Sequence, residues 1–227
     1  MQATHTPLTT ERIIAVCREL LTHGGVEAIV IREVARRLDV TAPALYKHAA
    51  GRDELLTLLI AACHREVAGV CEQARDASDP DDASTQLRDV TTAFRRWALA
   101  NPREFGLLYG QPIIGYSAPV GGPTTRGAQR FGTVFSAIYA QLLHEGRLRT
   151  PSAADLPAGF AESLTTSSLS PEYHLPPVVM YQFAMGFQRM LGLISVEVSG
   201  HLGWAMSDTD AFALQELENL VIELTTS

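Results

Sequence analysis

The stretch IREVARRLDVTAPALYKH, residues 31–48, decides the fold that this sequence predicts. Its first half places apolar residues at the spacing of one helical face: Val34, Ala35 and Leu38. The chain then turns at Asp39 and Val40, and Thr41 can cap a second short helix. Pro43 fits the first turn of that helix, where its missing N–H costs little. Two short helices joined by a tight turn make a helix-turn-helix, whose second helix enters the major groove of DNA.

The outer face of the predicted second helix suits contact with DNA. Small side chains at positions 42 and 44 let the helix approach the base edges, while flanking hydroxyl, amino and guanidinium groups can bind phosphates. The residues expected to contact DNA are Arg32, Thr41, Ala42, Pro43, Ala44, Tyr46, Lys47, His48 and Arg52. From Arg32 to Arg52 there are five basic residues against two acidic ones, although the whole chain has a net charge of −7. We therefore expect a locally basic head on an acidic body; the alternative is a solvated, charged helix face.

Almost all of the remaining chain also has the apolar periodicity of helices, so the predicted fold class is all-α. About nine helices are expected, among them a short one from Thr41 to His48 and longer ones over about residues 52–75, 124–146, 176–200 and 208–224. We expect two domains: a three-helix DNA-binding head over residues 1–54, and a helical domain for ligand binding and dimerisation over residues 55–227. The loop 110–123 is rich in glycine and proline and is expected to be ordered, whereas residues 149–174 are expected to be flexible in part.

The helix expected over residues 176–200 is apolar on more than one side. A helix of this kind is buried on both sides in a folded protein. One side can pack on its own subunit. The other can pack on a second copy, together with the last helix, in an intersubunit four-helix bundle. The residues expected at this dimer interface are Phe187, Leu191, Ile194, Leu214, Leu217 and Val221.

Residues 12–56 resemble the DNA-binding domain of the TetR family of transcriptional regulators. The shared positions are Gly25, Val34, Ala35, Leu38, Val40, Leu45, Tyr46, His48 and the run 52–56. By this resemblance, Tyr46 and Arg52 grip phosphate, and positions 42, 43, 44 and 47 face the bases. The sequence departs from the family in two places. Val30 and Ile31 stand where the family has a threonine or serine cap, and Asp39 stands where it has a turn glycine.

The resemblance extends into the body of the chain. Residues 95–119 and 186–204 are similar to the C-terminal domain of a subgroup of the same family, often called the WHG domain. It implies a dimeric regulator, by family habit a repressor, that binds a near-palindromic double-stranded DNA operator, but it does not name an effector. The aromatic and methionine residues of the body make a small apolar molecule the expected effector that releases the DNA. In such proteins the middle helices enclose the effector. The residues expected to line that pocket are Trp97, Phe105, Tyr109, Phe135, Tyr139, Phe183 and Met190. The alternative for the aromatic ones is core packing, which is the commoner role of aromatic residues at helical spacing.

The sequence does not support an enzyme, a metal or cofactor protein, or a membrane protein. It has no GxSxG, HExxH, P-loop or GxGxxG motif, and no two of its seven histidines are spaced i, i+3 or i, i+4. We therefore expect neither an enzyme nor a cofactor or metal site. Cys17, Cys63 and Cys71 lack CxxC spacing and lie among apolar residues, which predicts core packing. No apolar run is long enough to span a membrane and no signal peptide is recognisable, so a cytoplasmic protein without a membrane partner is expected.

One further alternative stays open. A helical interaction protein that has lost its operator would keep the same fold, and the missing cap at positions 30 and 31 leaves room for it. Binding to selected against random duplex DNA separates this alternative from a regulator, because true specificity spans several decades in affinity.

Overall fold

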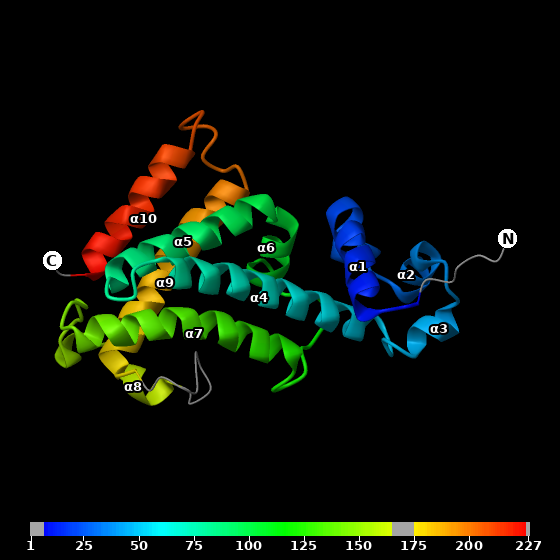
Figure 1. The fold of residues 1–227 in the computed structure, drawn as a ribbon, viewed down its shortest axis with the longest axis horizontal. Helices are drawn as coiled ribbons and strands as arrows, with labels where there is room; N and C mark the ends of the chain where they lie inside the picture. Colours follow the sequence, from blue (N-terminus) through cyan, green and yellow to red (C-terminus); the bar gives the residue numbers. More distant parts are fainter. Residues whose placement is uncertain (1–6, 165–174, 226–227) are drawn as a thin grey trace. The chain divides into compact units, whose positions relative to one another are not determined.

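The computed structural model describes residues 7–164 and 175–225 of the chain (Figure 1). Its α-helices are α1 (Thr10–Gly24), α2 (Ile31–Leu38), α3 (Ala42–Tyr46), α4 (Arg52–Ala77), α5 (Ala83–Ala100), α6 (Pro102–Tyr109), α7 (Pro123–His144), α8 (Phe160–Ser163), α9 (Pro177–Val198) and α10 (Asp210–Leu224). Two short 3-10 helices, η1 (Val26–Ala28) and η2 (Ala153–Asp155), complete the order. No strand occurs among the described residues, which confirms the all-α prediction. The one described α-helix outside the predicted ranges is the four-residue α8.

The helix ends follow local signals in the sequence. The Thr9 side chain caps α1 by accepting a hydrogen bond from the Arg12 N–H at 3.3 Å. Gly25 ends α1 with a φ of 69°, a left-handed value that glycine adopts without steric cost. Pro102 occupies the first turn of α6, and Pro177 that of α9, where a missing N–H is harmless.

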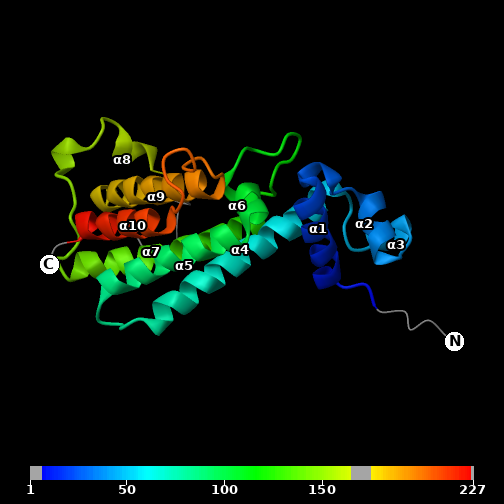
Figure 2. The ribbon, with the colours of Figure 1, turned by 90° about the horizontal axis from the view of Figure 1, so that it is seen from above.

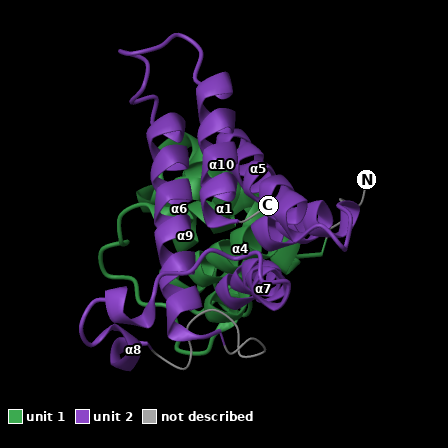
Figure 3. Ribbon diagram, turned by 90° about the vertical axis from the view of Figure 1, so that its left-hand side faces the viewer, with its two compact units in different colours: residues 1–65, 101–127 green, residues 66–100, 128–227 purple. Residues whose placement is uncertain are grey.

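The contacts among residues divide the chain into two compact units (Figure 3). The first unit contains residues 1–65 and 101–127, and the second contains residues 66–100 and 128–227. Helices α4 and α7 therefore contribute residues to both units. Helix α6 and the loop after it belong with the N-terminal helices, although we predicted them as part of the body. The functional boundary predicted between residues 54 and 55 stays a prediction.

The core of the first unit is apolar and is built by α1, α2, α3 and the first half of α4. Its fully buried members are Ile13, Cys17, Ile29, Val34, Leu45, Leu55, Leu56, Leu59 and Cys63. Burial raises the pKa of the Cys17 thiol to about 12, so the group stays protonated. Cys71, in the second unit, is also fully buried. All three cysteines are free and pack as small hydrophobic residues, as predicted.

The second unit packs α5, α9 and α10 against one another, and Figures 1 and 2 show α9 and α10 running side by side. Aromatic rings from α5, α7 and α9 fill its interior. Phe131 lies 5.2 Å from Phe94 and 5.1 Å from Phe135, and Phe183 lies 5.3 Å from Tyr139, measured between ring centroids. Tilted and edge-to-face pairs at these separations are the favoured aromatic geometries.

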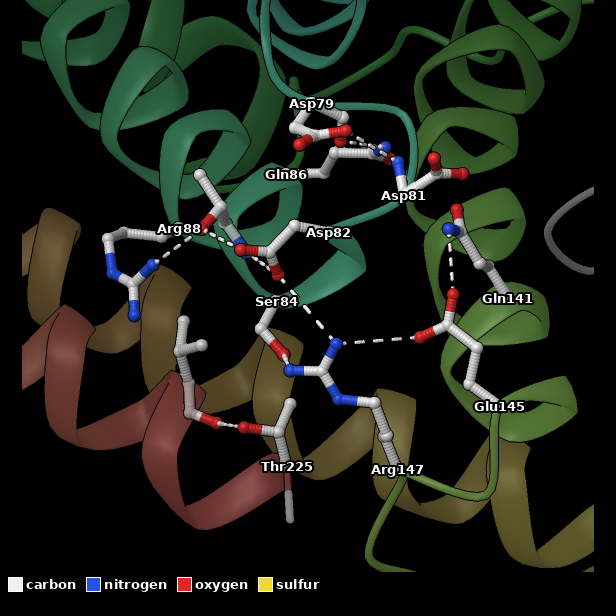
Figure 4. A network of polar contacts seen from close by, with 12 residues as sticks. Asp79, Asp81, Asp82, Ser84, Gln86, Arg88, Gln141, Glu145, Arg147 and Thr225 are labelled. Atoms are coloured by element: carbon white, nitrogen blue, oxygen red, sulfur yellow. Dashed lines mark hydrogen bonds and ion pairs between the residues drawn. The ribbon is translucent and has the colours of Figure 1, made fainter. Parts of the chain in front are cut away.

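A polar network ties the turn between α4 and α5 to the end of α7 (Figure 4). Arg147 donates a hydrogen bond to the Ser84 hydroxyl at 2.9 Å and lies within ion-pair distance of Asp82 and Glu145. The Gln141 amide donates to the Pro80 carbonyl at 2.8 Å. Within the polar stretch DASDPDDAS, residues 76–84, residues 78–82 therefore form an anchored turn between α4 and α5.

Candidate nucleic-acid interface and apolar cavity

The turn between α2 and α3 forms as predicted, at the cost of one strained residue. Asp39 has φ 54° and ψ 46°, and it is the one non-glycine residue with positive φ in the described part of the chain. Backbone hydrogen bonds close the turn, from the Asp39 N–H to the Arg36 carbonyl and from the Val40 N–H to the Ala35 carbonyl. The left-handed conformation costs a non-glycine residue roughly 1–2 kcal/mol, and aspartate tolerates it better than most residues. The absence of the family's turn glycine thus changes the energy of the turn and leaves its geometry intact.

The N-terminus of α2 has the weak cap that its sequence predicts. Val30 occupies the cap position, and its side chain makes no capping hydrogen bond. Its carbonyl still accepts hydrogen bonds from the N–H groups of Glu33 and Val34, so the helix begins at the expected residue. Helix α3, in contrast, has a proper cap, because the Thr41 hydroxyl accepts a hydrogen bond from the Ala44 N–H at 3.3 Å.

Helix α3 presents its outer face to solvent. Leu45 is fully buried and holds the helix on the core, whereas Tyr46 is 52% exposed. Among the residues predicted to contact DNA, the exposed ones are Arg32, Thr41, Pro43, Tyr46, Lys47 and His48, and the half-buried ones are Ala42, Ala44 and Arg52. The residues predicted to contact DNA therefore form an accessible surface around the five-residue helix α3.

Ion pairs reduce the positive charge of α2. The Glu33 carboxylate accepts hydrogen bonds from Arg36 at 2.7 Å and from Arg37 at 3.0 Å, and Arg37 also lies 3.4 Å from Glu19. The bond from Arg36, followed by the bond from Arg37, lowers the pKa of Glu33 to about 2. Arg32 and Lys47 form no ion pair with any residue that the structure describes. Arg32 and Lys47 therefore carry positive charge that no described carboxylate neutralises.

Arg52 has a structural role that the sequence did not reveal. Its guanidinium donates to the backbone carbonyls of Ile29 at 3.3 Å and Val26 at 3.2 Å, and it pairs with Glu27 at 3.1 Å. These bonds tie the start of α4 to η1. A phosphate contact by Arg52 would have to compete with them, so its loss would weaken the head itself as well as any DNA contact.

The second unit encloses an apolar cavity of about 10 Å³ between α5, α7, α9 and α10. Four of the seven predicted pocket residues line it: Phe135, Tyr139, Phe183 and Met190. The other three lie elsewhere. Trp97 packs near Phe94 and donates its indole N–H to Glu66 at 3.1 Å, while Phe105 and Tyr109 contact each other within the first unit. These three residues were predicted because they are aromatic, but aromatic composition alone does not show in which part of the fold a side chain packs.

The structure buries three of the six residues predicted at the dimer interface within the single chain. Ile194, Leu217 and Val221 are at most 2% exposed in the single chain, so they have no surface left to give to a partner. Phe187 is half-buried, stacks on Phe183 with a centroid separation of 6.0 Å and lines the cavity. Leu191 is half-buried and Leu214 is exposed. The apolar side chains that α9 and α10 expose are Met185, Phe212, Leu214 and Ile222.

The spacing of the buried residues in α9 could have identified the face of this helix that packs on the core. Its buried residues are Val179, Phe183, Gly186, Met190 and Ile194, at the i, i+4, i+7, i+11 and i+15 spacing of one helical stripe. Met185 lies off that stripe and is exposed. Because most residues of α9 are apolar, the buried stripe could not be distinguished from the rest of the helix by hydrophobicity.

The part of the chain that the structure describes has neither a helix suited to span a membrane nor a cluster of side chains suited to bind a metal ion. Within residues 7–164 and 175–225, no helix combines the length and apolar character needed to cross a membrane. In the same ranges, no three histidine, cysteine, aspartate or glutamate side chains are grouped so that they could share a metal ion.

The capped, exposed α3 behind a tight turn defines the class of this protein, which is a helix-turn-helix DNA-binding regulator of transcription. Residues 13–59 match the family model described as bacterial regulatory proteins of the tetR family. Residues 87–220 match the model described as a tetracyclin repressor-like C-terminal domain. The chain therefore belongs to the TetR family of transcriptional regulators.

Individual relatives agree with this assignment. The chain is 32% identical over 189 residues to the HTH-type transcriptional regulator Rv1816 of Mycobacterium tuberculosis, covering 82% of this chain and 78% of that protein. The solved structure of the protein SCO4313 is 26% identical, with a TM-score of 0.71 over 95% of this chain and 98% of that one. A regulatory protein of the tetR family from Rhodococcus RHA1, 18% identical, shares the fold with a TM-score of 0.65 over 98% of this chain and 100% of its own.

Proposed function

We propose that this chain is a repressor that binds a near-palindromic operator as a homodimer in the cytoplasm and is released by a small apolar effector. The observation that carries the DNA-binding part is the exposed outer face of α3, held on a rigid core by the buried Leu45. Thr41, Tyr46 and Lys47 supply phosphate donors there, and the small residues at 42 and 44 allow close approach to the bases.

Substitutions on α3 test this proposal. Tyr46→Ala and Lys47→Ala remove two exposed side chains, so the head should stay folded. A hydrogen bond to a charged phosphate is worth ~1.5–3 kcal/mol, so we expect each variant to bind every duplex about 10-fold or more weakly. Lys47→Ala should also reduce the slope of log affinity against log salt by about 1. Fluorescence anisotropy with labelled duplexes measures both effects.

Arg96→Ala is the matched control, because Arg96 is an exposed arginine on α5 in the second unit. Arg52→Ala is not a clean test, since it also breaks the bonds to η1. The proposed interface is contradicted if Tyr46→Ala and Lys47→Ala bind DNA as tightly as Arg96→Ala does.

The effector part of the proposal is supported by the cavity in the second unit and by α4, whose residues 52–65 belong to the first unit and 66–77 to the second. A helix shared by both units is a mechanical link through which an effector could change the presentation of α3. Couplings of this kind amount to ~1–3 kcal/mol, or roughly 5- to 150-fold in affinity, and they are reciprocal. Bound operator must therefore weaken the effector by the same factor.

A further inference from the structure

The turn between α9 and α10, residues 199–209, exposes a tryptophan. Trp204 is 87% exposed in the single chain, whereas Trp97, the other tryptophan of the sequence, is 5% exposed. The turn has a defined backbone, because the Met206 N–H donates to the Leu202 carbonyl at 3.1 Å. Figures 1 and 3 show the turn projecting beyond the ends of both helices. Packing buries ~150–250 Å² of a tryptophan, so an exposed one marks a surface that is stabilised when it is covered.

Helices α9 and α10 form a hairpin, and contacts between them show which residues share each end. At the turn end, the Thr209 hydroxyl donates to the Glu197 carboxylate at 3.3 Å. At the open end, Gly186 of α9 faces Leu224 of α10, since a Cβ added to this glycine would lie 3.3 Å from Leu224 Cδ1. The two helices therefore run antiparallel, and each end of the hairpin is defined by one such pair.

Exposed apolar side chains lie at both ends of the hairpin. Trp204 and Phe212 belong to the turn end, and Phe212 is 40% exposed. Met185 and Ile222 are close in sequence to the pair that marks the open end, and they are 42% and 53% exposed. Each end therefore has apolar surface that is in contact with water in the single chain.

The two ends also carry opposite charges. Asp208 is exposed at the turn end, and its carboxylate forms no ion pair with any residue that the structure describes. Arg149 is exposed at the open end, where its N–H donates to the Leu224 carbonyl at 2.9 Å. Its guanidinium likewise has no ion pair within the described ranges. Arg189 and Glu223, at the same end, pair with each other.

A two-fold axis can bring the exposed faces of two such hairpins together in two ways. In a parallel arrangement each end meets the same end of the other copy, so Asp208 faces Asp208 and Arg149 faces Arg149. In an antiparallel arrangement each end meets the opposite end, so Asp208 faces the partner's Arg149. Like charges disfavour the first arrangement, and opposite charges favour the second. The second arrangement also brings Trp204 to the partner's open end.

We propose that the turn 199–209 is an arm that packs Trp204 against Met185 and Ile222 of the partner subunit in an antiparallel, two-fold dimer. This arm rests on the proposed function, since it needs a homodimer, and it specifies which ends meet and which side chains make the contact. Methionine sulfur makes favourable contacts with aromatic rings, and tryptophan is among the commonest residues that dominate the affinity of protein interfaces. The two-fold axis makes the contact twice in each dimer.

Iodide quenching of tryptophan fluorescence measures the burial of Trp204 without any substitution. Trp97 is already buried in the single chain, so the quenchable emission reports on Trp204. We expect iodide to quench little of the emission of the dimer, and to quench an additional component after dilution below the dimer dissociation constant. Sedimentation at the same concentrations establishes the oligomeric state. Emission that is equally quenchable in dimer and monomer would show that Trp204 stays in water.

Trp204→Ala should raise the dimer dissociation constant at least ~30-fold, the factor that an interface residue of this importance typically contributes. The subunit should stay folded, because the side chain is exposed in the single chain. Ile114→Ala is the matched control. Ile114 is a 92% exposed apolar residue in the first unit, outside the proposed contact, so its variant should dimerise like the wild type in sedimentation equilibrium.

Charge reversal tests the antiparallel arrangement. Asp208→Arg and Arg149→Asp should each weaken the dimer roughly 5- to 30-fold, because each variant creates two pairs of like charges. The double variant should regain the wild-type affinity. A parallel dimer would leave all three variants like the wild type, since each keeps like charges opposite each other. Asp208 also accepts the Asp210 N–H at 2.9 Å, but Arg149→Asp would not rescue the loss of that local bond.

The proposed arm and the proposed homodimer fail in different ways. The arm is overturned if the wild type is a dimer whose Trp204 is fully quenchable, if Trp204→Ala dimerises like the wild type, or if the double charge variant does not recover. In each of these cases the homodimer itself stands. A wild-type protein that sediments as a monomer at micromolar concentration overturns both.

Discussion

At the scale of single residues, two hydroxyl side chains cap helices of the head, and one guanidinium joins segments that are far apart in sequence. Thr9 and Thr41 cap the helices that their positions indicated. Arg52 was predicted only as a phosphate ligand, yet it bonds two backbone carbonyls more than 20 residues away in sequence. Such long-range hydrogen bonds leave no periodic or motif signal, because they depend on how the chain closes on itself.

His64 gives a residue-scale prediction about pH. Burial lowers its pKa to about 4, its Nδ1 is buried without a partner among the described residues, and Gly127 lets α7 approach its Cβ closely. Folding therefore favours the neutral ring. The unfolded chain, with a pKa near 6.5, binds more protons below that pH, so stability is full above about pH 6.5 and falls until about pH 4.

Urea unfolding checks this prediction. We expect the free energy of unfolding to fall by about 2 kcal/mol between pH 7.5 and pH 5 because of His64 alone. The His64→Met variant, which cannot titrate, should lose correspondingly less over the same interval. Equal losses in the two proteins would show that His64 is not the responsible group.

At the scale of helices, the boundaries of α1, α5, α6, α7, α9 and α10 were predictable because glycine, proline and capping residues mark them. The inward face of α9 was not recognised. Ile194, a predicted dimer contact, is fully buried within its own subunit. Most positions of α9 are apolar, so hydrophobicity alone does not show which side faces the core. Tertiary packing against α5, α7 and α10 determines which side of α9 is buried.

A buried ion pair joins three helices of the second unit. Arg95 on α5 donates to Glu197 on α9 at 2.8 Å and to Asp210 on α10 at 2.8 Å. The side chains of Arg95 and Glu197 are 3% and 5% exposed. Removing one member of such a pair costs ~3–5 kcal/mol, because the other charge stays buried without compensation. We expect that loss of unfolding free energy for Arg95→Met.

Arg88→Met is the control for this prediction. Arg88 pairs with Glu218 of α10 in the same bidentate manner, but both side chains are about one-third exposed, so the loss should be at most ~1 kcal/mol. The double variant Arg95→Met with Glu197→Met should recover most of the stability. Equal effects of Arg95→Met and Arg88→Met in chemical denaturation would refute the importance of burial.

At the scale of the whole molecule, α9 and α10 have exposed apolar side chains that a second copy of the chain would cover. Helices α9 and α10 expose Met185, Phe212, Leu214 and Ile222 on the single chain. TetR regulators act as dimers, and a dimer buries such side chains in a two-fold interface.

Ile222→Asp tests the dimer directly. Ile222 is 53% exposed in the single chain, so the subunit itself should tolerate the charge, whereas a dimer interface would bury the charge unpaired. We expect this variant to sediment as a folded monomer at micromolar concentration. Leu143→Asp, which places the same charge at an exposed leucine of α7, should remain dimeric. A wild-type monomer, or a dimeric Ile222→Asp, would contradict the proposed interface.

The central claim, that α3 reads a specific operator, is tested most directly by selecting bound duplexes from a random DNA pool with the purified protein. We expect enrichment of a near-palindromic site whose half-sites lie on one face of the duplex, about 34 Å or a multiple of it apart. The selected duplex should bind roughly 1,000-fold or more tightly than random DNA of equal length. If no sequence is enriched, or if the enriched sequences lack two-fold symmetry, the account is contradicted and an interaction protein without an operator becomes the better description.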